Sequence, residues 1–274
     1  MIQKKYKALI SDFDGTLACT DKTVTRENLK AINELFSQGK KFALCTGRMT
    51  TSALMLAQKL PFKPLIATYN GGEIVDSATG EILSRHVLEP EIMLKLIDYG
   101  RERGLYYQIF TDEVIVEKIT EVTEFYCSIC KVRAVEVGDL KEYILREQKG
   151  SPKLMLINFK GDVNTYIEEI NEIFGSEVEA VRCYEGMIDV TSLGVNKGLA
   201  VKDLSKIWGI TPQDCVAVGD EGNDVAMFKV AGVGACMVNA REEVKKHADY
   251  VTKNNNDESG VAEVIQKFLI EEKL

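Results

Sequence analysis

The sequence of 274 residues predicts an α/β protein in which a parallel-sheet core is interrupted by an α+β insertion. Two observations support this fold class. Short apolar runs alternate with amphipathic helical segments in the first third of the chain and again after Val190, which is typical of strand–helix–strand units. Between about Arg85 and Ile188 the alternation stops, and helices are mixed with hairpin-like strands.

The first third of the chain supplies half of the predicted core. Its clearest element is a helix over 25–38, because Leu29, Ile32 and Leu35 share one face, Thr25 can cap the helix and Gly39 can end it. Apolar runs that end in polar residues predict the strands on either side of this helix. The expected elements are strands 7–11, 42–45 and 64–68, helices 25–38 and 51–60, and a hairpin around 76–80.

The insertion and the return to the core complete the predicted map. The insertion is expected to hold helices 91–103, 121–130, 140–148 and 163–174, with strands at 109–110, 114–116 and 154–159. After it come helices 198–208 and 223–230, strands 215–218, 232–237 and 250–251, and a closing helix around 261–269. The predicted domains are a Rossmann-like core, 1–84 and 189–274, and an α+β cap domain, 85–188.

Composition and charge indicate which kinds of molecule the protein binds and where in the cell it is found. The net charge of −8 and the pI of about 5.1 do not favour nucleic acid or an anionic membrane. Seven scattered cysteines, an odd number, suit reduced thiols better than a disulfide framework, and no run of apolar residues is long enough to span a membrane. We therefore expect a cytoplasmic protein with a small-molecule substrate. Protein partners and oligomeric state are not predicted.

Polar residues follow three of the predicted strands at the point where each strand ends. Asp12 and Asp14 come after the first strand, and Thr46 comes after the second. Asp220 follows strand 215–218. If these strands are parallel and adjacent, their carboxylates and hydroxyl group converge at one edge of the sheet. Acids held close together repel one another unless a cation lies between them or their pKa values differ.

Residues 12–17 on their own fit a surface turn, a calcium loop or a catalytic loop. A calcium loop of the EF-hand type needs further oxygen ligands and a Glu at its twelfth position, and the residues after Gly15 do not supply them. The motif from Gly219 to Asp224 adds further acids and an amide, which are ligands that suit Mg²⁺. Lys197 precedes a predicted helix, where its charge adds to an anion site.

Together these residues resemble the four motifs of the haloacid dehalogenase superfamily, and the long insertion resembles the α+β (type IIB) cap of its Cof-type branch. The matching segments, in order, are Asp12-x-Asp14-Gly15-Thr16, Thr46-Gly47-Arg48, Lys197, and Gly219-Asp220-x-x-Asn223-Asp224. The resemblance spans essentially the whole chain. Two positions depart from the family pattern, since Glu221 replaces a small or neutral residue and Val238 stands where a glycine is common.

The resemblance implies a role for each motif residue. Asp12 would attack phosphorus to form an aspartyl-phosphate, and Asp14 would protonate the leaving alcohol and then activate water. Arg48 would face the leaving group or the cap. Mg²⁺ would be held by Asp12, the backbone carbonyl of Asp14, Asp220 and Asp224. The transferring phosphoryl group would contact Thr46, Gly47, Lys197 and Asn223.

The expected function is therefore Mg²⁺-dependent hydrolysis of small phosphomonoesters, such as sugar phosphates or phosphorylated cofactors. A cap that closes over the substrate would exclude bulk water and select the leaving group. One alternative is a phosphotransferase, for example a sugar phosphomutase, that passes the same aspartyl-phosphate to a second hydroxyl. The other is a non-catalytic regulator that binds a metabolite. The sequence does not name the physiological ester.

Overall fold

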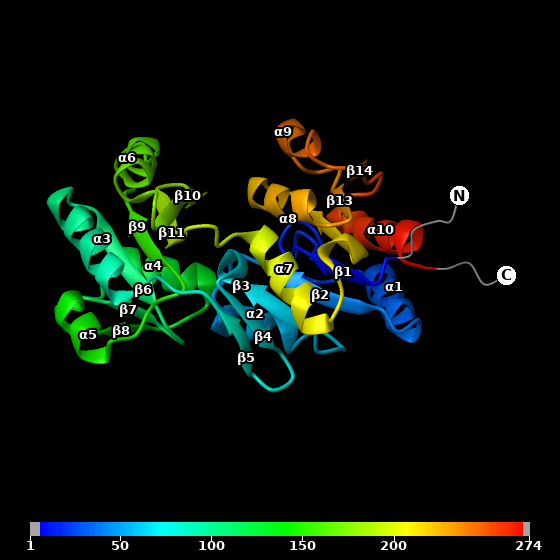
Figure 1. The fold of residues 1–274 in the computed structure, drawn as a ribbon, viewed down its shortest axis with the longest axis horizontal. Coiled ribbons are helices and arrows are strands. Elements are labelled where there is room, and N and C mark those ends of the chain that lie inside the picture. The colour runs from blue at the N-terminus through cyan, green and yellow to red at the C-terminus, as the bar shows by residue number, and fades with distance from the viewer. Residues whose placement is uncertain (1–5, 271–274) are drawn as a thin grey trace. The chain divides into compact units, whose positions relative to one another are not determined.

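A computed structural model describes residues 6–270, which form two sheets with helices around them (Figure 1). The first compact unit comprises the chain up to Gly47, Ala57–Ser84 and the chain from Asn196 onward. The second comprises Arg48–Leu56 and Arg85–Val195. The parallel sheet at the core of the first unit confirms the predicted α/β class.

The first unit is built on an eight-stranded sheet within the described residues, in the order β14-β13-β12-β1-β2-β3-β4-β5. The pairs from β14 to β3 are parallel, and β4 runs antiparallel to β3. The strands are β1 (Ala8–Ser11), β2 (Lys41–Cys45), β3 (Leu65–Thr68), β4 (Glu73–Asp76), β5 (Ile82–Arg85), β12 (Cys215–Gly219), β13 (Val233–Cys236) and β14 (Tyr250–Val251). Because β1 lies between β2 and β12, the residues that follow these three strands reach the same edge.

Helices cover both faces of this sheet. Small and apolar side chains of the central strands, such as Ile10 and Ala43, form one core cluster with Val201 and Leu204 of α7 and with α8. Helices α1 and α10 contact each other, and they reach β2 and β12 respectively. The helices of this unit are α1 (Arg26–Ser37), α7 (Lys197–Trp208), α8 (Val225–Val230), α9 (Glu242–Lys245) and α10 (Gly260–Phe268), with 3-10 turns η1 (Tyr69–Gly71), η2 (Pro212–Asp214), η3 (Gly222–Asp224) and η4 (Asn256–Glu258).

The limits of α1 follow from its sequence as predicted. Thr25 is the N-cap, and its hydroxyl accepts a hydrogen bond from the backbone N–H of Asn28 at 3.2 Å. At the other end Gly39 has φ +73°, a left-handed conformation that a glycine adopts without strain. The buried face of the helix includes Ile32 and Leu35, two of the residues that predicted it.

The second unit holds a six-stranded sheet in the order β10-β11-β9-β6-β7-β8, antiparallel except for the pair β7–β8. Side chains of α3, α5 and α6 join one face of the sheet in a single core cluster. The strands are β6 (Tyr106–Phe110), β7 (Val114–Val116), β8 (Ala134–Glu136), β9 (Leu154–Ile157), β10 (Val178–Tyr184) and β11 (Met187–Ser192). The helices are α2 (Thr50–Ala57), α3 (Pro90–Glu102), α4 (Glu121–Cys130), α5 (Leu140–Glu147) and α6 (Asn164–Phe174).

The hairpin of β10 and β11 was not predicted, and it bears on where the second unit ends. Strand β11 pairs with β9 as well as with β10, so it belongs to the second sheet throughout its length. The domain boundary expected between 188 and 189 falls inside this strand, and the compact unit continues to Val195. Residues 48–56 also group with this unit. The functional division into core and cap stays a prediction.

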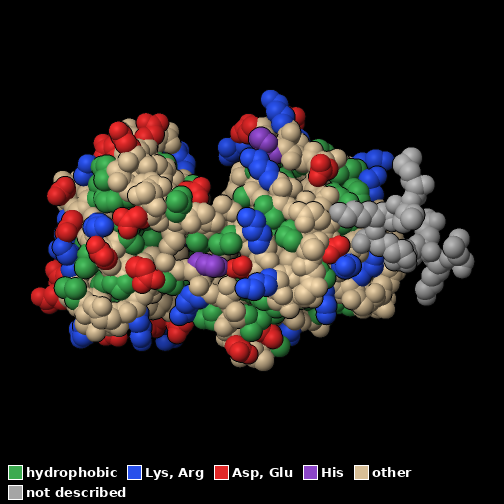
Figure 2. Space-filling model, viewed as in Figure 1, with side chains coloured by type: hydrophobic (Ala, Val, Ile, Leu, Met, Phe, Trp, Pro, Cys, Tyr) green, Lys and Arg blue, Asp and Glu red, His purple; other side chains and the backbone are tan. Residues whose placement is uncertain are grey.

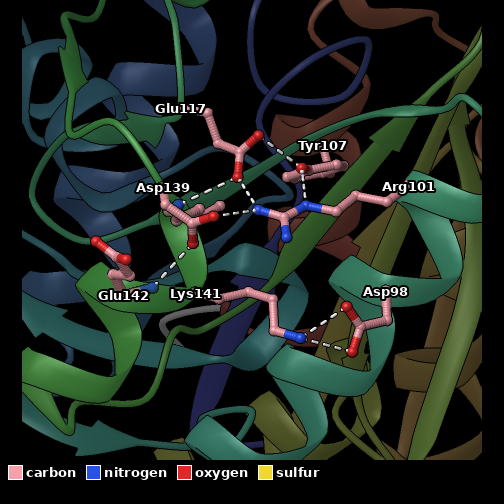
Figure 3. Close-up of polar contacts among 8 residues, drawn as sticks. Asp98, Arg101, Tyr107, Glu117, Asp139, Lys141 and Glu142 are labelled. Carbon is pink, nitrogen blue, oxygen red and sulfur yellow. Dashed lines mark hydrogen bonds and ion pairs between the residues drawn. The ribbon is translucent and has the colours of Figure 1, made fainter.

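A polar network joins α3, β6 and α5 of the second unit (Figure 3). The guanidinium of Arg101 donates through Nε to Tyr107 Oη at 2.8 Å, and through Nη2 to Glu117 and to Asp139 Oδ2, the latter at 2.9 Å. Tyr107 Oη donates in turn to Glu117 Oε2 at 2.7 Å. Although partial burial opposes the charge, the hydrogen bonds from Tyr107 and Arg101 lower the pKa of Glu117. Asp139 also caps α5, so Arg101 fixes the start of that helix.

The surface shown in Figure 2 carries interspersed acidic and basic side chains on both units. No large block of one charge is visible on this face. Within residues 6–270, no helix combines the length and the apolar character needed to cross a membrane.

The Arg101 network predicts a measurable effect on the stability of the second unit. Arg101→Met removes the donor shared by Tyr107, Glu117 and Asp139, and should lower the free energy of unfolding in urea by about 1–2 kcal/mol. Arg146→Met is the matched control, because Arg146 is exposed on α5 and pairs with the adjacent Glu147. It should change stability by less than about 0.5 kcal/mol. Equal effects of the two substitutions would show that the network is not stabilising.

Candidate active site

Strand pairing brings the predicted site residues to one edge of the first sheet. Ser11 of β1 lies beside Val218 of β12 and Leu44 of β2, so the residues after these strands start from neighbouring positions. The backbone N–H of Asp12 donates to Val218 O at 2.9 Å, which continues the pairing past the end of β1. Asp12, Thr46 and Asp220 therefore follow three strands that are parallel and adjacent in the sheet.

Lys197 bridges two buried carboxylates at this edge. Its Nζ lies 2.6 Å from Asp12 Oδ1 and 2.6 Å from Asp224 Oδ1. The lysine is only 2% exposed, and Asp12 and Asp224 are 6% and 0% exposed. Lys197 is the first residue of α7, and Asn196 caps the helix through its side chain. The ammonium group is thus fixed at a helix start rather than extended into solvent.

Asp220 and Asp224 are held by different donors. The hydroxyl of Thr16 donates to Asp220 Oδ1 at 2.6 Å. Asp224 Oδ2 accepts the backbone N–H groups of Asp220 at 2.8 Å and of Glu221 at 2.9 Å. The loop after β12 therefore folds around Asp224, and both carboxylates are held in defined orientations.

Two glycines make room for these acids. Gly15 has φ +77°, and a Cβ at this position would lie 2.3 Å from Asp220 Oδ2. At Gly219 a Cβ would lie 2.2 Å from Asp224 Cγ. Gly15 thus allows the loop after β1 to approach the loop after β12 closely, and Gly219 allows the loop after β12 to fold back over the side chain of its own Asp224.

The carboxylates carry more negative charge than Lys197 can balance. Burial, with a contribution from Asp224, raises the pKa of Asp12 from 3.8 to about 8 although Lys197 opposes the shift. Burial likewise raises the pKa of Asp220 to about 6. Burial disfavours the charge of Lys197, but Asp12 and Asp224 outweigh it and raise the pKa of the lysine above its usual value. Lys197 therefore stays cationic, while the acids need a further positive charge to ionise fully near neutral pH.

The acidic cluster fits a divalent cation. Asp12, Asp220 and Asp224 each offer one carboxylate oxygen, and these oxygens lie within 4.8 Å of one another. Three hard oxygen donors in a small volume, with a surplus of negative charge, are the ligands that Mg²⁺ prefers. All three residues were predicted as metal ligands from the sequence.

Asp14 takes a different position from Asp12. Its carboxylate is partly exposed and accepts a hydrogen bond at Oδ1 from Lys22 Nζ at 2.9 Å. Two acids one residue apart therefore lie in different environments, one buried beside Lys197 and the other near solvent. Such a difference is what two distinct roles in one reaction require.

The remaining predicted residues, Thr46, Gly47, Asn223 and Arg48, lie in three places. Thr46 is buried after β2, and its backbone N–H donates to Ala67 O at 2.8 Å. Gly47 and Asn223 both lie close to the side chain of Asn70, to which Asn223 Nδ2 donates at 3.0 Å. Arg48 falls in the second compact unit, where its Nη1 lies 3.5 Å from Ser52 Oγ. The expected phosphate contacts and the leaving-group contact of Arg48 stay predictions.

Sequence reasoning gave no role to four residues that contact the site. Thr16 binds Asp220, Asn70 binds Asn223, and Lys22 binds Asp14. Asn239 donates through Nδ2 to Gly15 O at 2.9 Å. Thr16, Asn70 and Asn239 stand in short polar segments that follow strands, a signal that identifies them as candidates but does not indicate their partners.

Comparison with known proteins identifies the family to which this chain belongs. Residues 9–265 match the family model of haloacid dehalogenase-like hydrolases. Two Bacillus subtilis proteins, both named 5-amino-6-(5-phospho-D-ribitylamino)uracil phosphatase, are similar to this chain. One is 28% identical over 96% of this chain and 98% of its own length, and the other is 29% identical over 96% of each.

A solved structure shows the same relationship. A haloacid dehalogenase-like hydrolase from Bacteroides thetaiotaomicron is 29% identical, with a TM-score of 0.82 over 96% of this chain and 99% of the other. The chain belongs to the haloacid dehalogenase-like hydrolase family, and the resemblance seen in its motifs is confirmed. Its enzyme class is that of a hydrolase of phosphoric monoesters.

The raised pKa values predict how the stability of the metal-stripped protein depends on pH. The folded protein holds a proton on Asp12 far more tightly than the unfolded chain, with a pKa of about 8 against 3.8. The stabilisation is therefore complete below about pH 4 and is lost as pH rises toward 8, by up to about 1.4 kcal/mol per pH unit for one proton. In EDTA, the free energy of unfolding should fall from pH 5.5 to pH 8.

Asp12→Asn is the control for this slope, because it removes the titrating group and leaves both histidines in place. The variant should show a clearly flatter dependence over the same pH range. An unchanged slope in the variant, or a wild-type stability that rises with pH in EDTA, would contradict the assignment of the slope to Asp12.

Proposed function

We propose that this enzyme hydrolyses small phosphomonoesters in a Mg²⁺-dependent reaction that passes through an aspartyl-phosphate on Asp12. The observation that carries the proposal is the pairing of Lys197 with Asp12 and Asp224 beside Asp220. It combines a nucleophilic carboxylate, a fixed positive charge and a set of oxygen ligands at one edge of the sheet.

Mg²⁺ would be held by Asp12, Asp220 and Asp224 together with the backbone carbonyl of Asp14. When bound, the ion supplies positive charge that offsets repulsion between the acids and the phosphoryl oxygens. The chain supports this role, because Thr16 orients Asp220 and two backbone N–H groups orient Asp224. Hydrogen bonds that orient the ligating side chains increase the affinity of a site for its metal.

In the first step one oxygen of Asp12 attacks phosphorus, and the bond between phosphorus and the leaving oxygen breaks. Asp14 donates its proton to that oxygen, so the product leaves as a neutral alcohol. In the second step Asp14 accepts a proton from water, which attacks the aspartyl-phosphate and releases inorganic phosphate. The ammonium of Lys197, 2.6 Å from Asp12 Oδ1, stabilises charge on the nucleophile and on the transferring group.

We further propose that Thr46, Gly47 and Asn223 contact the phosphoryl oxygens with Lys197. The substrate class is a phosphorylated sugar, sugar alcohol or cofactor precursor. The Bacillus subtilis relatives support this class, since their name specifies a phosphate on a ribityl chain attached to a uracil ring. A cytoplasmic location is part of the proposal, and the absence of a disulfide among all seven cysteines supports it.

Metal removal tests the proposal first. Hydrolysis of 4-nitrophenyl phosphate should be lost in EDTA and restored by Mg²⁺, and Asp220→Asn should raise the Mg²⁺ concentration for half-maximal rate about tenfold or more. Glu81→Gln, which removes an exposed acid outside the cluster, should leave this concentration unchanged. Full activity in EDTA would refute the metal dependence.

A panel of phosphate esters then tests the reaction and its rival. We expect release of one inorganic phosphate for each alcohol formed, and loss of turnover by at least about a thousandfold in Asp12→Asn. Transfer of the phosphoryl group to a second sugar without release of phosphate would indicate a phosphotransferase. Retained turnover in Asp12→Asn would exclude Asp12 as the nucleophile.

A further inference from the structure

Lys22 contacts Asp14, the proposed proton carrier. It lies in a turn outside the four sequence motifs. Its Nζ lies 2.9 Å from Asp14 Oδ1, and the two side chains are 55% and 34% exposed. We propose that Lys22 is a positioning residue that holds the Asp14 carboxyl group in the orientation for proton transfer to the leaving oxygen. The inference rests on the proposed role of Asp14 and extends it to a second residue.

The backbone of Lys22 is unusual for a lysine. Its φ of +67° lies in the left-handed region, where glycine and asparagine are favoured and other residues cost about 1 kcal/mol or more. Glycine at this position would relieve the strain but would provide no side chain to reach Asp14. A strained position whose side chain contacts a reactive group is a pattern associated with functional sites.

The turn that carries Lys22 is tightly hydrogen-bonded. The backbone N–H of Cys19 donates to Thr23 O at 2.8 Å, and that of Lys22 donates to Cys19 O at 2.9 Å. Asp21 Oδ1 accepts from Thr23 N at 2.9 Å and from Thr23 Oγ1 at 2.6 Å. These bonds close a small loop, so the position of the Lys22 backbone is fixed relative to Thr23 and Cys19.

A distant residue attaches this turn to the rest of the first unit. Asp257, in η4, accepts the backbone N–H of Thr20 at Oδ1 and the Thr20 hydroxyl at Oδ2, each at 2.8 Å. The hydrogen bonds from the backbone and side chain of Thr20 lower the pKa of Asp257. Asp257 thus anchors the base of the turn, and the turn delivers the ammonium group of Lys22 to Asp14.

As a stabilising contact alone, the ion pair between Lys22 and Asp14 would contribute little. Ion pairs between exposed side chains typically contribute between 0 and about 1 kcal/mol to stability. In the proposed reaction Asp14 gives its proton to the leaving oxygen as the bond to phosphorus breaks, and it becomes a carboxylate. An ammonium group at 2.9 Å both orients the carboxyl group before this transfer and stabilises the charge that develops during it.

The test compares two esters of similar size with different leaving groups. Phenyl phosphate releases a more basic oxygen than 4-nitrophenyl phosphate, so its cleavage depends more strongly on proton donation. The ratio kcat/KM reports the steps up to transfer of the phosphoryl group from the ester, with Mg²⁺ at saturation. Lys22→Met should lower kcat/KM for phenyl phosphate about tenfold more than for 4-nitrophenyl phosphate.

Three further variants make the result specific. Lys22→Arg keeps a positive donor of similar reach and should restore most of the loss. Asp257→Ala keeps Lys22 but releases the turn, and should give a smaller loss with the same preference between esters. Lys30→Met, which removes an exposed lysine from α1, should leave both ratios and the unfolding temperature unchanged.

Asp14→Asn separates failure of this inference from failure of the proposed function. It should show the same preference between the two esters, and Lys22→Met should add no further loss in that background. If Asp14→Asn shows no preference, Asp14 is not the proton donor. A second outcome is that Asp14→Asn shows this preference while Lys22→Met lowers kcat/KM for the two esters equally or not at all. That result would show that Lys22 does not position Asp14.

Discussion

The ammonium group of Lys197 between two buried carboxylates is the interaction on which the site depends. Asp12 and Asp224 both lie 2.6 Å from its Nζ, and all three residues are shielded from water. Removing the lysine would leave two uncompensated charges in a medium that stabilises them poorly. Since Asp220 adds a third acid, the cluster has excess negative charge that a divalent cation can balance. The need to balance the charge of the buried carboxylates thus governs both the structure of the site and its proposed chemistry.

The strand order of the first sheet brings the charged residues of the site together. Residues that are 185 positions apart in the sequence meet because β1 pairs with β12 and α7 starts at the same edge. Gly15 then lets the loop after β1 approach Asp220 more closely than a residue with a Cβ would, and Gly219 leaves room for Asp224 within the loop after β12. The partly exposed Asp14 lies outside the buried cluster, so proton transfer and nucleophilic attack are assigned to acids in different surroundings.

Patterns local in sequence predicted much of this molecule. Apolar runs indicated β1, β2 and β12. The N-cap residue Thr25 and the terminal Gly39 indicated α1. The motifs indicated Asp12, Lys197 and Asp220, which the structure brings together. The hairpin of β10 and β11 was missed, because its pairing with β9 determines it more than its own composition does. Contacts such as Thr16 with Asp220, 204 positions apart, depend on tertiary structure and have no local signal.

The most direct test of the account is to identify the residue that carries the phosphoryl group. With Asp14→Asn protein, saturating Mg²⁺ and 4-nitrophenyl phosphate, the second step should be slow and the intermediate should accumulate. Mass spectrometry after acid quenching should find one phosphoryl group on the peptide that contains Asp12, and none when Asp12 is also replaced by Asn. A phosphoryl group on another residue, or one that persists without Asp12, would contradict the account.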